Sequence, residues 1–153
     1  MESNVPDFIL FLGRFHPLVV HLPIGFLIFA FVLELYGRWK RDFAVSMAIE
    51  FALLGGAIRA AVATVLGYML SLSGDYEQDM LDTHFWFGIA TTLVAFLAWS
   101  ILSGKLHIPK LNGLKANIAG LTLVVILVAI TGHYGGNLTH GSDYLVKYAP
   151  FGR

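Results

Sequence analysis

The chain has 153 residues, of which 57% are hydrophobic and only 13% are charged, and its ten Lys and Arg residues balance ten Asp and Glu residues. A soluble domain typically carries about 25% charged residues, so this composition excludes a water-soluble domain and a disordered chain and indicates an integral membrane protein. Because no basic excess is available to neutralise phosphates, nucleic acid is excluded as a partner.

Apolar stretches in the sequence predict four membrane-spanning helices. Residues 1–15 lack the features of a secretory signal and suit a short interfacial segment. The spans then cover about residues 17–36, 43–72, 83–102 and 116–134, and a Gly-rich tail follows over residues 135–153. Pro23 cannot donate a helical hydrogen bond to Val19, so we expect a kink there or a helix that starts one turn later. The predicted fold class is all-α, a single-domain integral membrane four-helix antiparallel bundle.

Basic residues are unevenly distributed between the two ends of this bundle. The two loops at one end hold Arg38, Lys40, Arg41, Lys105, Lys110 and Lys115, whereas the other end holds Arg14, Lys147 and Arg153. The positive-inside rule places the more basic end in the cytoplasm. Both termini and the acidic loop at residues 73–82 are then expected outside.

Histidines gather at the outer end of the predicted bundle. Five of the six lie there: His16, His21, His84, His133 and His140. An ionisable residue at membrane depth is expensive to bury and therefore suggests a function. Imidazoles that converge from different helices are how a bundle holds haem or a metal ion, and cysteine, the other common soft ligand, is absent.

Spacing constrains how these histidines can act. His16 and His21 are five residues apart, about 140° around a regular helix, so we do not expect both to ligate one iron. The Gly135-Gly136 pair predicts the end of the last helix, after which His140 is expected to fold back over the end of the bundle.

Small residues and one arginine extend the candidate site. The second span presents Gly56, Ala60, Ala63 and Gly67 on one helix face, and Gly88 follows His84 by four residues. Such positions let a flat porphyrin, or simply another helix, approach the backbone closely. Arg59 lies deep in the second span, where we expect it either to neutralise a haem propionate or a quinone oxygen or to pair with Glu50.

Three interpretations of the histidines remain open: haem b, another metal such as copper or zinc, and a hydrogen-bonded structural cap. The first predicts an electron-transfer subunit rather than a complete enzyme. It would hold one or two non-covalent haem groups between histidine pairs and pass electrons between the quinone pool and an outer acceptor. The alternative is a non-catalytic membrane anchor or assembly subunit, in which the histidines with Asp82, Asp143 and Tyr144 form a polar network.

Three motifs give the chain a resemblance to a known family. The opening motif is LGRFHPLVVHLPIG (residues 12–25), the closing motif is TGHYGGNLTHGSDYL (residues 131–145), and His84 with Trp86 and Gly88 forms the third. Together they resemble the domain of unknown function 2231, a bacterial four-helix membrane module often found ahead of the cytochrome c domain in planctomycete-type cytochrome c proteins.

The resemblance implies a multi-pass protein of the bacterial inner membrane with periplasmic termini and electron transfer at the outer face. The expected partners, besides the lipid bilayer, are other redox subunits or a periplasmic c-type cytochrome. Because the chain carries no cytochrome domain of its own, any such cytochrome is expected to be a separate polypeptide.

Overall fold

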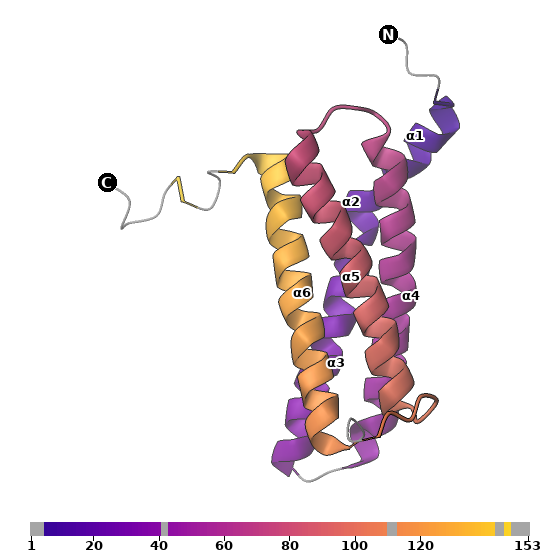
Figure 1. Cartoon of the computed structure of the whole chain (residues 1–153), viewed down its shortest axis with the longest axis vertical. Helices are drawn as coiled ribbons and strands as arrows, with labels where there is room; N and C mark the ends of the chain where they lie inside the picture. The colour runs from indigo at the N-terminus through magenta and orange to yellow at the C-terminus, as the bar shows by residue number, and fades with distance from the viewer. Residues whose placement is uncertain (1–4, 41–42, 110–112, 143–145, 148–153) are drawn as a thin grey trace.

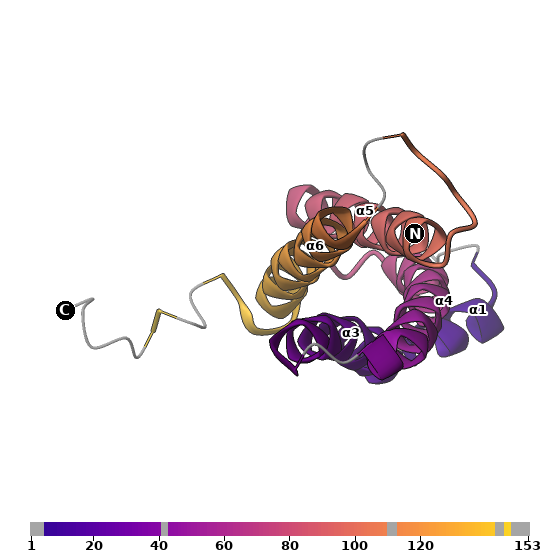
Figure 2. The same ribbon diagram turned by 90° about the horizontal axis from the view of Figure 1, so that it is seen from below.

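The apolar stretches fold into four long helices that stand side by side (Figure 1). The computed structural model describes residues 5–40, 43–109, 113–142 and 146–147. Its elements are α1 (Asp7–Gly13), α2 (His16–Val19), α3 (His21–Lys40), the 3-10 helix η1 (Phe43–Val45), α4 (Ser46–Ser71), α5 (Gln78–Leu102) and α6 (Leu114–His140). Seen along its axis, the bundle runs in the order α3, α4, α5 and α6, and α6 returns to pack against α3 (Figure 2). The all-α four-helix prediction is therefore confirmed.

Four segments are long and apolar enough to cross a membrane: Asp7–Lys40, Ser46–Ser71, Gln78–Leu102 and Ala116–His140. α1 and the end of α6 lie at the same end of the bundle, which we call the histidine end, and the opposite end is the basic end (Figure 1). The side of the membrane that each end faces stays a prediction. Several residues used in that prediction or in the polar-network alternative lie outside the described residues: Arg41, Lys110, Asp143, Tyr144 and Arg153.

The first span is interrupted near its start. α2 ends at Val19 and α3 begins at His21, because Pro23 has no N–H to bind the carbonyl of Val19. α1 lies outside α4 (Figure 2), and a Cβ on Gly13 would come within 2.5 Å of the Leu70 backbone nitrogen. This close crossing fixes the chain against α4 just before His16.

Two helices are longer than predicted. α5 begins at Gln78 because the carboxylate of Glu77 accepts from the backbone nitrogens of Asp79 and Met80, at 3.1 and 2.8 Å. α6 continues through Gly135-Gly136 to His140, so the predicted helix end at the glycine pair is wrong. Gly141, with a φ of 91°, ends the helix instead.

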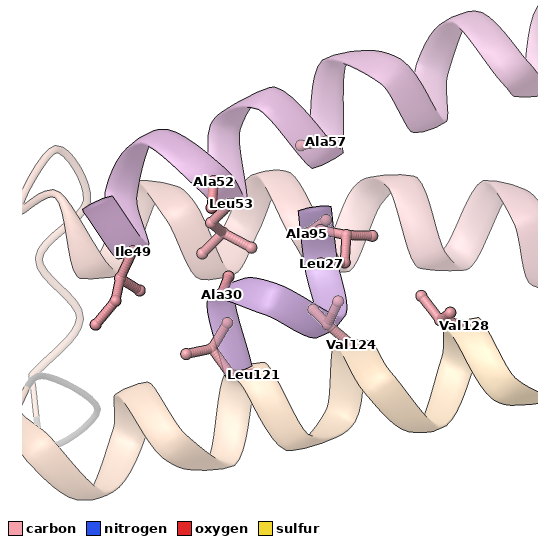
Figure 3. Packing of buried hydrophobic residues seen from close by; sticks show 10 residues of the cluster. All are labelled: Leu27, Ala30, Ile49, Ala52, Leu53, Ala57, Ala95, Leu121, Val124 and Val128. Atoms are coloured by element: carbon pink, nitrogen blue, oxygen red, sulfur yellow. The ribbon is translucent and has the colours of Figure 1, made fainter. Parts of the chain in front are cut away.

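The hydrophobic core fills mainly the basic half of the bundle (Figure 3). Ten buried residues form it: Leu27, Ala30, Ile49, Ala52, Leu53, Ala57, Ala95, Leu121, Val124 and Val128. Gly56 lies against this core, since a Cβ there would be 2.6 Å from Cδ2 of the fully buried Leu27. At Gly56 the stripe of small residues therefore serves packing between α3 and α4.

This contact predicts opposite effects for two glycine substitutions. Gly56→Ala should lower the free energy of unfolding by about 1–3 kcal/mol, because the buried Leu27 side chain must shift to admit the added methyl group. Gly25→Ala is the control: no atom lies within 4 Å of its Cβ position, and the gain in helix propensity should stabilise by about 0.5–1 kcal/mol. Unfolding in mild detergent measures both, and equal effects would contradict the assignment of Gly56 to tight packing.

Candidate functional site

A backbone carbonyl and a glycine of α4 fix the position of the His16 ring. Its Nδ1 lies 2.8 Å from the carbonyl oxygen of Ala63. Because a carbonyl oxygen only accepts, Nδ1 carries the proton and donates, which leaves Nε2 as an acceptor with a lone pair. The ring lies over Gly67, where a Cβ would be 2.9 Å from Cε1 of the imidazole. A side chain at position 67 would therefore displace the ring.

His84 repeats this arrangement on the other half of the bundle. Its Nδ1 donates to the carbonyl oxygen of Thr131 on α6 at 3.0 Å, which again leaves Nε2 as an acceptor. A Cβ on Gly135 would lie 2.9 Å from Cε1 of His84. Gly135, the first residue of the glycine pair that predicted a helix end, thus leaves the space that the imidazole of His84 occupies.

The two arrangements belong to an internal repeat. Each histidine is 47 residues from its carbonyl partner, and in each case the glycine follows that partner by four residues. Position 84 follows position 16 by 68 residues, and the same offset aligns GYMLSLSGDY (residues 67–76) with GGNLTHGSDY (residues 135–144). The hairpin of α2, α3 and α4 and the hairpin of α5 and α6 are therefore related. Self-comparison of the sequence at this offset would have revealed the pair.

The two imidazoles meet at the histidine end of the bundle. Their ring centroids are 6.1 Å apart and their planes are inclined by 82°. Both line a cavity of about 540 Å³ that extends between the four long helices. Ala60, Ala63, Gly67 and Gly88 of the predicted site line it as well. Gly88 leaves open space, since the nearest atoms to a Cβ there are 4.0 Å away.

Threonines of α4, α5 and α6 line this cavity, and sequence reasoning did not single them out. The hydroxyl oxygens of Thr64 and Thr92 are 3.3 Å apart, and those of Thr91 and Thr131 are 3.1 Å apart. Each hydroxyl also has a carbonyl acceptor four residues back on its own helix, at 2.7–2.9 Å. The adjacent positions Thr91 and Thr92 thus join α5 to both of its neighbours, and the cavity lining includes these hydrogen-bonded hydroxyls beside the buried apolar side chains of Leu27 and Val128.

The remaining predicted histidines lie elsewhere. His21 and His140 line the cavity and are exposed. His140 is the last residue of α6, so the expectation that it folds back after a helix end at the glycine pair is wrong. His133 is exposed, does not line the cavity, and accepts a hydrogen bond from Nδ2 of Asn137 at 3.2 Å. Among the described residues, no group of three or more His, Asp or Glu side chains is arranged to hold a metal ion.

Arg59, another residue of the predicted site, lies away from this arrangement. It is exposed on the outer surface of the bundle and does not line the cavity with the two imidazoles. Its guanidinium carbon lies 5.4 Å from the ring centroid of Phe26. Within the part of the chain that the structure describes, it forms no ion pair with Glu50. Arg59 and Glu50 are nine residues apart on α4 and therefore lie on opposite sides of the helix.

Comparison with known proteins gives one match. A family model described as a predicted membrane protein (DUF2231) matches residues 14–146, which include both imidazoles and nearly all of both repeats. No curated protein and no solved structure matches the chain.

Proposed function

The chain belongs to the DUF2231 family of predicted membrane proteins, and we propose that it is a b-type haem-binding electron-transfer subunit. The family description does not itself specify the chemistry of the site. One non-covalent haem would lie between His16 and His84. The observation that carries the proposal is the pair of imidazoles: each is fixed through Nδ1 by a carbonyl, which leaves Nε2 as an acceptor, and both rings line one shared cavity.

The donor set fits haem better than a bare metal ion. Structural and catalytic zinc sites use three or four protein ligands, whereas haem iron receives four from the porphyrin and needs only axial ones from the protein. Metal–nitrogen bonds of about 2.0 Å would place the ring centres of two imidazoles that bind opposite sides of one metal roughly 6 Å apart, close to the observed 6.1 Å. The Nδ1–H to carbonyl bonds are the support that metal-bound histidines usually have.

The cavity also fits a flat apolar cofactor. Its volume of about 540 Å³ lies within the range of roughly 300–1,000 Å³ typical of cofactor pockets. Glycine and alanine on α4, α5 and α6 let a planar group approach the backbone. A bound haem would supply one-electron exchange, and the low-dielectric surroundings would tune its potential. The proposed donor and acceptor are the quinone pool of the bacterial inner membrane and a periplasmic acceptor such as a c-type cytochrome.

The absorption spectrum of the purified full chain tests this proposal. Expression in haem-replete cells should give a Soret band, resolved α and β bands on reduction, and one haem per chain by pyridine haemochrome assay. The ferric form should be low-spin, because His16 and His84 would both ligate the iron. A folded preparation that stays colourless after incubation with haemin would overturn the proposal.

The second candidate function is a non-catalytic anchor or assembly subunit. It is favoured by the same hydrogen bonds, since His16 joins α2 to α4 and His84 joins α5 to α6 without any ligand. Replacing either histidine distinguishes the two functions. Loss of colour from a folded protein supports haem, and loss of folding or of complex assembly from a colourless protein supports the anchor.

A further inference from the structure

Arg59 places a positive charge on the outer face of the bundle at the middle of a span. It is the fourteenth of the 26 residues of α4, so each end of the helix is at least about 18 Å away along the axis. The hydrocarbon core of a bilayer is about 30 Å thick, so this residue lies near its centre. A charged side chain at that depth is costly and nearly always faces a polar partner or a cavity.

The surroundings of Arg59 compensate this charge only partly. The ring of Phe26 provides a cation–π contact. The other residues that form a groove with it are apolar: Val19, Leu22, Gly55, Ile58 and Val62. Leu22, Ile58 and Val62 remain 44–49% exposed, so the groove, of about 480 Å³, is open along α3 and α4.

Within the four spans that the structure describes, no carboxylate lies at this depth, so a second copy of the chain offers none there. The acidic residues of the four spans lie towards the two ends: Asp7, Asp79 and Asp82 at the histidine end, Glu34 and Glu50 towards the basic end. Glu34 is also buried, and its Oε1 already accepts from Arg38 at 2.7 Å.

The internal repeat shows that the charge is specific to one hairpin. With the offset of 68 residues, Ile58 and Arg59 align with Ile126 and Leu127 on α6. The two isoleucines are almost equally exposed, at 49% and 50%. The corresponding face of α6 therefore has the same apolar character without the arginine.

We propose that the groove around Arg59 binds a transmembrane helix of a different polypeptide, and that this helix carries an Asp or Glu side chain level with Arg59. Apolar residues of the partner would fill the space beside Gly55 and Ile58. Its carboxylate would neutralise the guanidinium, which converts an unfavourable charge in lipid into a contact that selects the partner. The proposal does not depend on haem.

Fluorescence energy transfer from the labelled protein to labelled transmembrane peptides in liposomes tests whether the groove binds such a helix. The chain contains no cysteine, so a single Met47→Cys substitution, at a position that is 78% exposed, gives one donor-labelled site away from the groove. The probes are acceptor-labelled Leu/Ala-rich transmembrane peptides with one central Glu or one central Gln, compared at mildly alkaline pH. The Glu peptide should associate about tenfold more tightly, the scale of one interhelical polar contact in a membrane.

Variants then locate the contact. Arg59→Met should reduce association of the Glu peptide to the level of the Gln peptide, whereas Arg59→Lys should retain part of the preference. Ile58→Trp should weaken binding by filling the groove, and Ile126→Trp, its equivalent in the repeat, should have no effect. Equal association of the two peptides with the unaltered groove overturns the proposal. Self-association of the chain that Arg59→Met abolishes also overturns it, since a second copy would then cover the groove.

Discussion

His84→Ala should lose the six-coordinate haem spectrum, and His16→Ala should lose it equally, while His133→Ala keeps it. The two imidazoles are related by the internal repeat and line the cavity from opposite hairpins, each with Nε2 left as an acceptor, and the proposed haem needs one ligand from each. Removing an axial ligand should reduce haem affinity by more than about tenfold, the lower end of the losses seen when only a supporting group is removed. Haem content per chain and the Soret band measure the effect.

His133→Ala is the matched control because it removes an imidazole at the same end of the bundle. His133 is exposed and is bonded to Asn137 rather than to the cavity. Far-UV circular dichroism of all three variants checks that the helices are retained. Haem binding that depends on His133 but persists in both His16→Ala and His84→Ala would show that the site lies elsewhere.

The number and type of helices could be predicted from the sequence because they depend on local composition. Each span is an apolar stretch about as long as a bilayer requires or longer, and the break beside Pro23 follows from its missing N–H. The end of α6 was not predictable in this way. Glycine usually ends a helix, but Gly135 lies inside α6 because His84 occupies the space where a side chain would be. This role of Gly135 becomes visible only in the contact between α5 and α6.

The site could be predicted only in part, again because contacts between helices are not visible in the sequence. Clustering at one end of the chain's spans identified five histidines, but their rotation about each helix decides which of them meet. His16 and His84 face each other, whereas His133 is turned outwards. Arg59 likewise lies at the predicted depth but on the outer face of α4. A search for repeats is the sequence signal that would have distinguished His16 and His84 from the others.

Gly135→Ala should weaken haem binding about 10- to 100-fold, the range observed when a group that supports a metal ligand is removed. The added Cβ would lie 2.9 Å from Cε1 and 3.3 Å from Nδ1 of His84, so the ring must move and its bond to the Thr131 carbonyl must lengthen. With His16 still in place, the remaining haem should become five-coordinate and high-spin. Titration of the apoprotein with haemin and EPR of the ferric form measure both effects.

Gly132→Ala provides the control because Gly132 lines the same cavity, on the same helix, with no atom within 4 Å of its Cβ position. That variant should bind haem like the wild type, so the comparison separates displacement of His84 from any general effect of alanine in α6. Gly67→Ala should reproduce the loss through His16, since its Cβ would lie equally close to that ring, at 2.9 Å. If Gly135→Ala and Gly67→Ala both bind haem normally, haem binding does not require the positions that the His84 and His16 rings occupy beside these glycines. That result would contradict the proposal that the two histidines hold the haem.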